Sequence, residues 1–176
     1  MDTVDMRVSN NSVFPLVFIG PMGAGKTRVG RRVARALEMP FIDTDKRIVA
    51  AYGPISEIFE REGEDYFRVM EREAVVEALA EVAVVSLGGG AVMHKETRAD
   101  LTQSTVVFLS VSAAAVKNRI GGRKRPLLRE ASGDWQRIYD ERRPIYEALA
   151  NIRFDTSNRK VDNIAEDIVT WLREKL

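Results

Sequence analysis

Short apolar runs and longer periodic stretches alternate along the chain. The runs of strand length cover residues 14–19, 39–42, 82–87, 105–109 and 151–154. Between them, apolar residues recur at every third or fourth position, which is the spacing of amphipathic helices. Helices are therefore expected at residues 26–37, 48–52, 56–59, 64–81, 94–102, 113–120, 135–149 and 164–172. Residues 1–13 are polar and aperiodic, and they are expected to form a flexible N-terminal tail.

This alternation of strands and helices predicts a parallel α/β sheet with helices on both faces, because no two strands are joined by a two-residue hairpin turn. The chain shows no internal repeat and no linker, so residues 14–176 are expected to form a single domain. In such sheets, ligands bind beyond the carboxyl ends of the strands. Those ends are Gly20, residues 43–45 and residues 88–90.

The segment from Gly20 to Thr27 reads G-x-x-x-x-G-K-T, and it lies between a predicted strand and a predicted helix. That context is typical of a P-loop, whereas a chance glycine turn would not have both flanks correct. Lys26 is expected to reach the β- and γ-phosphates of a nucleotide, and the Thr27 hydroxyl to help hold Mg²⁺. Backbone N–H groups of the ATP-binding loop would come from Gly23, Ala24 and Gly25.

Composition narrows the class of protein. The chain has 176 residues, of which 45% are hydrophobic and 30% charged, as expected of an ordinary soluble domain. It has no cysteine and a single histidine, so disulfides, thiolate metal sites and histidine-built metal centres are excluded. A net charge of +1 gives no overall attraction to nucleic acid or to anionic membranes. The N-terminus does not resemble a signal peptide, and no apolar run approaches the ~20 residues of a membrane span, so a cytoplasmic location is expected.

Asp43 and Asp45 flank Thr44 directly after the second predicted strand. If the backbone stays extended there, alternation places both carboxylates on one side. One could then hold Mg²⁺ and the other could accept a proton from a hydroxyl nucleophile. The alternative is a polar turn in which an aspartate caps the next helix. The neighbouring P-loop favours the functional interpretation.

Three consecutive glycines, Gly88 to Gly90, follow a strand of the fully buried type. Glycine lets the backbone approach a ligand closely, and the N–H groups of such a turn can receive an anion. The alternative is a tight turn that only starts the next helix. Glycine in triplicate reduces stability more than one turn requires, which favours a binding role.

Arg142 interrupts the apolar stripe of the helix expected at 135–149, where an aliphatic residue would be normal. A buried arginine needs an anionic partner. That partner is either a carboxylate of the core or the carboxylate of a substrate held by two hydrogen bonds. Arg68 lies beside the stripe of the helix at 64–81 and could equally be a solvated helix charge.

The stretch from Arg119 to Arg129 carries five basic residues and no acidic one: Arg119, Arg123, Lys124, Arg125 and Arg129. A solvated loop and a nucleic-acid patch are the alternatives, and the second lacks interleaved aromatic residues. Beside a P-loop, the segment at about 121–132 is better interpreted as a lid that closes over phosphates. His94 is expected in an exposed loop, and Trp135 and Trp171 in the core.

Taken in order, the segments GPMGAGKT, IDTD, GPISEIF, EDYFR, SLGGG, KRPLL and RRPIY resemble the motifs of the shikimate kinase family, over residues 17–154. The first motif is common among nucleotide-binding proteins, whereas the combination is specific. The resemblance implies transfer of the γ-phosphate of ATP to the 3-hydroxyl group of shikimate, with Mg²⁺, in aromatic amino-acid biosynthesis. It also implies a fold of the nucleoside monophosphate kinase type. This is a three-layer α/β/α sandwich with a five-stranded parallel sheet, a substrate-binding segment at about 44–70 and a mobile lid.

On the donor side, the resemblance implies that Asp43 organises Mg²⁺ together with Thr27. Arg119 falls where the family stacks an arginine on adenine. Arg125, which precedes a proline, matches the lid arginine that contacts the transferring phosphate and would act with Lys26 in catalysis.

On the acceptor side, Asp45 would bind the substrate hydroxyl groups and serve as the catalytic base. Arg68 and Arg142 match the two arginines that hold the carboxylate, and Gly89 matches a backbone N–H donor. Arg142 is chosen over its neighbour Arg143 because it lies on the apolar face. The pocket would be walled by Ile55, Phe59, Phe67 and Pro126.

Two other functions are compatible with the motifs. One is a P-loop kinase for another small hydroxy acid, such as gluconate, or for a nucleoside monophosphate. The other is a nucleotide-binding regulator without catalysis, which would need neither Asp45 as a base nor a basic lid. The expected partners are ATP and shikimate, with no nucleic acid and no membrane, and the chain is expected to be a monomer.

Overall fold

The computed structural model describes residues 13–120 and 131–175. It contains a five-stranded sheet in the order β2-β3-β1-β4-β5, and every neighbouring pair is parallel. The strands are β1 (Leu16–Ile19), β2 (Phe41–Asp43), β3 (Val84–Ser86), β4 (Thr105–Ser110) and β5 (Ile152–Asp155). The predicted parallel α/β fold is confirmed. Residues 1–12 of the predicted tail and residues 121–130 of the predicted lid lie outside the described residues.

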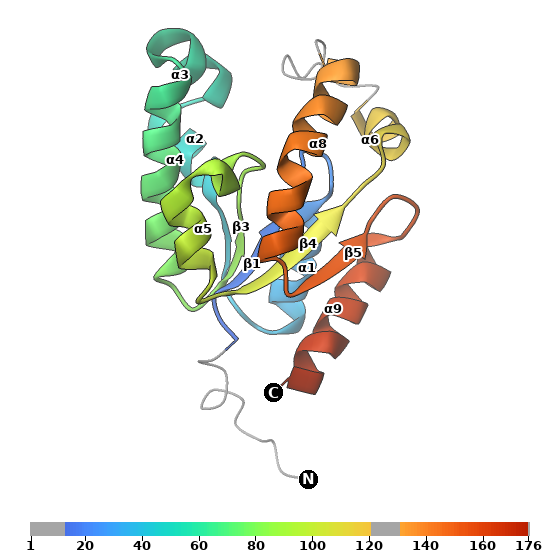
Figure 1. Ribbon diagram of the computed structural model, residues 1–176. Helices are drawn as coiled ribbons and strands as arrows, with labels where there is room; N and C mark the ends of the chain where they lie inside the picture. The colour runs from blue at the N-terminus through green and yellow to red at the C-terminus, as the bar shows by residue number, and fades with distance from the viewer. Residues whose placement is uncertain (1–12, 121–130, 176) are drawn as a thin grey trace.

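Helices follow the strands and cover both faces of the sheet. They are α1 (Lys26–Ala36), α2 (Thr44–Tyr52), α3 (Ile55–Glu62), α4 (Glu64–Leu79), α5 (Lys95–Leu101), α6 (Ala113–Ile120), α8 (Ala131–Leu149) and α9 (Val161–Lys175), with a short 3₁₀ helix η2 (Ala91–Met93). Figure 1 shows α5 and α8 in front of the sheet, with α1 behind it, and α1 packs against α9. The arrangement is the predicted three-layer α/β/α sandwich.

Strand β1 lies at the centre of the sheet, and all four of its residues are buried. It pairs with β3 on one side, where Leu16 lies opposite Val84, and with β4 on the other, where Leu16 lies opposite Thr105. The chain leaves β1 toward β2 on one side of the sheet, and it leaves the adjacent strand β3 toward β4 on the other side. This is the topological switch point of the sheet, and the loop after β1 opens into the crevice that forms there.

A second, smaller hydrophobic cluster lies outside the main core, among α2, α3 and α4. Its buried members are Ile48, Ile58, Phe67 and Met70. Because this cluster is separate from the core around the sheet, the three helices form a small packing unit of their own beside β2. This unit corresponds to the segment predicted to bind the acceptor.

Several boundaries differ from the prediction for local reasons. Strand β1 begins at Leu16 because Pro15 has no N–H group for the sheet ladder. Helix α3 begins at Ile55, one residue earlier than expected, with Pro54 at its N-cap. Helix α8 begins at Ala131, earlier than residue 135. His94 is exposed, as expected, but it caps α5 by accepting the N–H of Glu96.

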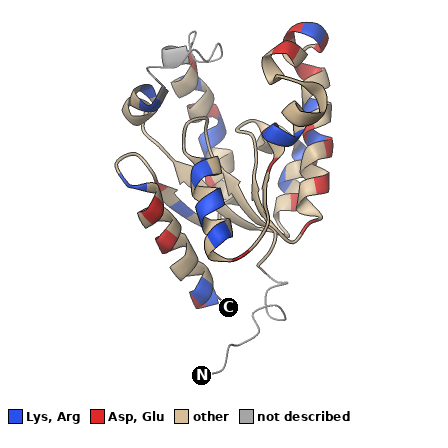
Figure 2. Cartoon of the chain, turned by 180° about the vertical axis from the view of Figure 1, so that it is seen from behind, with Lys and Arg blue, Asp and Glu red and all other residues tan. Residues whose placement is uncertain are grey.

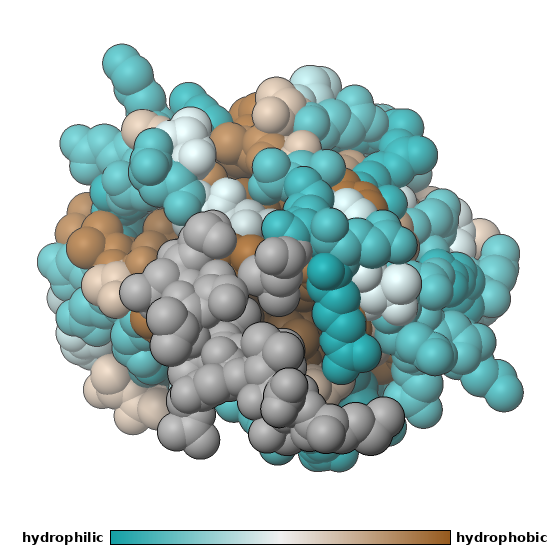
Figure 3. All heavy atoms as spheres, turned by 90° about the horizontal axis from the view of Figure 1, so that it is seen from below, coloured by the Kyte–Doolittle hydropathy of each residue, from teal (hydrophilic) through white to brown (hydrophobic). Residues whose placement is uncertain are grey.

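The end of the molecule that carries the amino ends of the strands is shown in Figure 3. Its visible outline is formed mainly by hydrophilic residues, with a smaller hydrophobic area near the grey atoms. None of the helices in residues 13–120 and 131–175 combines the length and apolar character that a membrane span requires.

Candidate active site

The loop after β1 connects the central strand directly to α1. Gly20 has a φ of 146°, and a Cβ atom there would collide with the carbonyl oxygen of Leu109 in β4. Gly25, with a φ of 91°, is the N-cap residue of α1 and provides no capping side chain. The first N–H groups of α1 are therefore left for another acceptor. Together with the helix dipole, they form an arrangement that suits a polyphosphate.

Lys26 is the first residue of α1, and its side chain folds back onto the loop. Its Nζ atom donates hydrogen bonds to the carbonyl oxygens of Gly20, at 2.6 Å, and Pro21, at 3.0 Å. Burial lowers the pKa of Lys26 to about 8, while the carboxylates of Asp45 and Asp43 act in the opposite direction. The ammonium group therefore stays protonated at neutral pH. It must exchange two neutral acceptors for a phosphate when a nucleotide binds.

Thr27 and Asp43 meet across the cleft. The Thr27 hydroxyl donates a hydrogen bond to Oδ2 of Asp43 at 2.7 Å. The other oxygen of Asp43 accepts the N–H of Lys46 at 3.1 Å and caps α2. The capping role and the metal-organising role predicted for Asp43 are thus compatible, because they use different oxygens.

This hydroxyl–carboxylate pair offers the hard oxygen ligands that Mg²⁺ prefers. In the described part of the chain, no three His, Cys, Asp or Glu side chains gather into a metal cage. A site of this kind suits an ion that takes its remaining ligands from water and phosphate, as Mg²⁺ commonly does. The residues present therefore fit Mg²⁺.

Asp45 lies in the first turn of α2 and not on an extended segment. The expected alternation of the two aspartates is therefore wrong, because Asp43 caps a helix that begins at Thr44. The helical turn nevertheless brings Asp45 into the same cleft. Burial, followed by the nearby carboxylates of Glu71 and Asp43, raises the pKa of Asp45 to about 6. A carboxyl group with this pKa suits proton transfer near neutral pH.

Glu71 in α4 is part of the site and was not predicted from the sequence. Its side chain is 5% exposed, and it forms a salt bridge of 2.7 Å with Arg68, which contacts Glu64 at 3.4 Å. Burial lowers the pKa of Arg68, but Glu71 and Glu64 more than compensate, so the guanidinium is firmly charged. Arg68 is thus held in place rather than free in solvent. Glu71 interrupts an apolar stripe between Phe67 and Val75, which is the signal that singled out Arg142.

The glycines after β3 make room for these charged side chains. A Cβ atom on Gly88 would lie 2.7 Å from Oδ1 of Asp45 and 3.0 Å from Oε2 of Glu71. A Cβ atom on Gly90 would lie 2.5 Å from the Arg68 guanidinium. A side chain at either position would therefore displace the carboxylates or the guanidinium, which pack directly against the backbone of the turn.

Arg142 reaches the same turn from α8. Its guanidinium lies 3.5 Å from the position that a Cβ atom would take on Gly89, and its charge adds to burial in lowering the pKa of Lys26. No carboxylate of the described residues lies within 4.0 Å of it, so the alternative of a core ion pair finds no support there.

Tyr146, one turn further along α8 and fully buried, donates its hydroxyl to the carbonyl oxygen of Gly89 at 2.5 Å. Burial raises the pKa of Tyr146 to about 12, so it stays a donor.

Three side chains hold the carbonyl groups of the P-loop from outside. Arg119 donates to the Gly23 carbonyl at 2.9 Å and also bonds to the backbone carbonyl of Thr156. The Thr156 hydroxyl donates to the Ala24 carbonyl at 2.7 Å. Trp135, buried as expected, donates its indole N–H to the Met22 carbonyl at 2.9 Å. With its carbonyls held outward, the loop presents its N–H groups to the cleft. The stacking of Arg119 on adenine stays a prediction.

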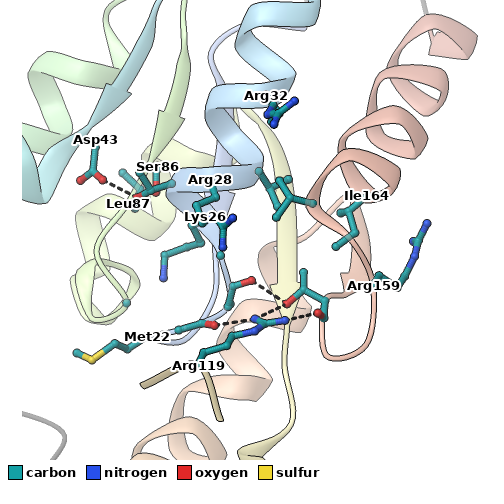
Figure 4. Close-up of a pocket in the computed structure, with 18 of the residues that line it drawn as sticks. Met22, Lys26, Arg28, Arg32, Asp43, Ser86, Leu87, Arg119, Arg159 and Ile164 are labelled. Atoms are coloured by element: carbon teal, nitrogen blue, oxygen red, sulfur yellow. Dashed lines mark hydrogen bonds between the residues drawn. The ribbon is translucent and has the colours of Figure 1, made fainter. Parts of the chain in front are cut away.

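A cavity of about 1110 Å³ lies along the P-loop (Figure 4). Among the predicted site residues, its wall contains Gly23, Ala24, Gly25, Lys26, Thr27, Asp43, Asp45, Gly89 and Arg119. Four predicted acceptor residues, Arg68, Arg142, Phe59 and Phe67, do not line it. Phe59 and Phe67 instead pack against each other in the cluster of α2–α4, with tilted rings whose centroids lie 4.9 Å apart. Arg125 lies outside the described residues.

A phosphate-binding loop that shares a cavity with a half-buried carboxylate is what a P-loop kinase requires, and the strand order is that of the nucleoside monophosphate kinase type. A family model described as shikimate kinase matches residues 22–173. The chain belongs to the shikimate kinase family, and it is an enzyme.

Individual relatives agree with the family model. The chain is 44% identical over 160 residues to a shikimate kinase of Salinispora arenicola, a match that covers 89% of this chain and 96% of that protein. It is 41% identical over 165 residues to a shikimate kinase of Rhodococcus jostii, covering 90% and 97%. Among solved structures, the shikimate kinase from Acinetobacter baumannii in complex with shikimate has a TM-score of 0.85 at 32% identity, covering 91% and 93%.

Proposed function

We propose that this chain transfers the γ-phosphate of ATP to the 3-hydroxyl group of shikimate, giving shikimate 3-phosphate and ADP in aromatic amino-acid biosynthesis. Membership of the shikimate kinase family supports this reaction, as does similarity to a relative described in complex with shikimate. The observation that carries the proposal is the position of Asp45. This half-buried carboxyl group shares the cavity wall with the P-loop lysine and meets Glu71 at Gly88, and its pKa is raised to about 6.

On the donor side, the loop and the first turn of α1 bind the phosphates of ATP through backbone N–H groups. Lys26 leaves the carbonyls of Gly20 and Pro21 and pairs with the phosphoryl group in transfer. Arg125 is proposed, from the family resemblance alone, to neutralise the same group. Thr27 and Asp43 would hold Mg²⁺, which would neutralise negative charge on the phosphates of ATP.

On the acceptor side, Arg68 and Arg142 hold the carboxylate of shikimate, and the N–H group of Gly89 adds a donor. Phe59, Phe67 and Ile55 give the segment that carries Arg68 its rigidity through their packing. Asp45 accepts the proton of the attacking hydroxyl group. Holding the acceptor at both its carboxylate and its hydroxyl makes the transfer effectively unimolecular, which is the main contribution a kinase can make to such a reaction.

The choice of acceptor is tested by offering ATP with shikimate, gluconate or a nucleoside monophosphate in separate reactions. We expect ADP release above the acceptor-free background with shikimate and not with the other two, because two arginines beside one aspartate suit a molecule with a carboxylate and hydroxyl groups. ADP release is followed with a coupled assay. Release with gluconate or a nucleotide instead of shikimate would contradict the proposed acceptor.

Replacing Arg142 with alanine is expected to raise the KM for shikimate by about 10- to 100-fold, since a hydrogen bond to a charged group contributes about 1.5–3 kcal/mol. ATP binding should change little. The measurements are steady-state kinetics with each substrate varied in turn and calorimetric binding of ATP.

The matched control is Arg143→Ala. Arg143 is the next residue, but it is exposed and paired with Glu147 at 2.8 Å. It should leave both affinities unchanged. An equal loss of both affinities in Arg142→Ala, or the same loss in the control, would contradict the carboxylate role.

Mg²⁺ as the metal, the monomeric state and the cytoplasmic location stay predictions from the sequence. The same holds for the absence of nucleic-acid and membrane partners, and for the lid at about 121–132.

A further inference from the structure

The cavity continues beyond the P-loop between α1 and the turn that precedes α9. This part of its wall includes the basic residues Arg28, Arg32 and Arg159 (Figure 4), together with Lys160 and the acidic residue Asp162. Arg28 belongs to the first turn of α1 and follows Thr27 directly. Unlike Lys26 and Thr27, it is not part of the G-x-x-x-x-G-K-T motif, and the mechanism described above gives it no role.

The other arginines of α1 have structural explanations. The helix contains no acidic residue, and Figure 2 shows it as a row of basic positions. The Arg31 guanidinium lies over the ring of Phe41, 5.8 Å from its centroid. Arg32 forms a salt bridge of 2.7 Å with Asp162. Arg35 lies in the last turn, where the helix dipole favours a cation.

Arg28 lies at the other end of α1 from Arg35. It is exposed in the first turn of α1, where the helix dipole disfavours a positive charge. No carboxylate of residues 13–120 and 131–175 lies within 4.0 Å of its guanidinium. Burial and, after it, the charge of Arg28 lower the pKa of Arg119. Two guanidinium groups in the wall of one cavity thus repel each other, and an anion between them would remove that repulsion.

The cavity wall places Arg28 beside other basic residues. It shares that wall with Arg159 and Lys160, which precede α9, and with Arg119, whose guanidinium is tied to the carbonyls of Gly23 and Thr156. An anion bound by Arg28 would lie in this part of the cavity, where the phosphates that stay on the nucleotide are expected.

We propose that Arg28 binds the non-transferred phosphates of the nucleotide, so that it contributes to the affinity for ATP and ADP alike and not to the transfer step. The inference rests on the proposed function, in that it takes ATP as the donor. Because the non-transferred phosphates are present before and after the reaction, the contact is equally strong in substrate and transition state. Such uniform binding lowers the KM for ATP without raising kcat.

The test compares Arg28→Gln with the wild-type chain in calorimetric titrations with ADP and with adenosine, and in steady-state kinetics with ATP. We expect the Kd for ADP and the KM for ATP to rise by about 10-fold, as for the loss of a charged hydrogen bond. Adenosine binding, the KM for shikimate and kcat should change by less than twofold. The thermal midpoint should equal or exceed that of the wild-type chain, because an unfavourable cation has left the helix N-terminus.

Arg31→Gln is the control, since it removes the same charge from the same helix at a position outside the cavity wall. It should leave the Kd for ADP unchanged. An unchanged Kd for ADP in Arg28→Gln, an equal loss of adenosine binding, or a loss of kcat would each overturn the proposal. If the wild-type chain binds ADP but does not phosphorylate shikimate, the proposed function fails while the role of Arg28 stands or falls on the ADP titration alone.

Discussion

Replacing Asp45 with asparagine is expected to lower kcat by about 10²- to 10⁴-fold, which is the usual contribution of a positioned general base. The amide has nearly the same shape and can still donate a hydrogen bond to a substrate hydroxyl, but it cannot accept a proton. Shikimate binding should therefore weaken much less than the rate falls. The measurement is single-turnover formation of ADP with both substrates saturating.

The control is Asp65→Asn, which makes the same change at an exposed position in the first turn of α4. This variant should keep the wild-type rate. If Asp45→Asn retains a kcat within about threefold of wild type, the carboxylate does not act as the base, since a positioned base contributes far more.

The same residue predicts how the wild-type rate depends on pH. Burial, followed by Glu71 and Asp43, raises the pKa of Asp45 to about 6, and the base is active only when ionised. The value of kcat/KM for shikimate, which reports groups of the free enzyme, should therefore rise with pH through about 6 and then level off. In Asp45→Asn this rise should disappear from the residual activity.

The free energy of unfolding should fall with rising pH, whereas kcat/KM rises. A carboxyl group with a raised pKa binds a proton more tightly in the folded chain than in the unfolded chain, so stability falls as pH rises through the window from about 4 to 6. Above that window, the ionised Asp45 reduces the free energy of unfolding by about 1–3 kcal/mol. Asp45→Asn should accordingly be more stable than wild type at pH 8 by denaturant unfolding.

The structure brings together the donor-side residues that local sequence signals single out. Lys26 and Thr27 belong to one short motif, and the conformation of that motif follows from its glycines and its flanking strand and helix. The residues that contact this motif in space could not be predicted from the local sequence. Arg119 contacts a loop carbonyl 96 residues away along the chain, and Trp135 one that is 113 residues away. No periodicity encodes such a contact.

On the acceptor side, the pattern of apolar positions along a helix identifies some site residues and misses others. Arg142 was noticed because a charge interrupts an apolar stripe, and Glu71 interrupts another stripe in the same way. Tyr146 could not have been noticed, because it belongs to its stripe as a core residue while its hydroxyl alone reaches Gly89. Asp45 lies in the cavity as predicted, but the helix that Asp43 caps brings it there and not the alternation of an extended segment.

Replacing Lys26 with methionine is expected to lower kcat by about 10²- to 10³-fold, as for the loss of one preorganised donor to developing charge. Methionine keeps most of the apolar stem but lacks the ammonium group, so the phosphoryl group in transfer loses a partner. In the free chain, the same group bonds to the carbonyls of Gly20 and Pro21. When ATP binds, Lys26 therefore loses these two hydrogen bonds as it gains one to a phosphate, and the net gain in affinity is small. The additional attraction to the charge that develops in the transition state requires no further loss.

The loss should therefore fall on kcat more than on the Kd for ADP, which is the reverse of the pattern expected for Arg28→Gln. Rapid-quench measurement of product formation and calorimetric titration with ADP separate the two effects. Lys46→Met serves as the control, because Lys46 is exposed in α2 and only its backbone N–H contacts Asp43. If Lys26→Met and Arg28→Gln showed the same balance of lost rate and lost ADP affinity, the division of the P-loop into a transferring and a holding side would be wrong.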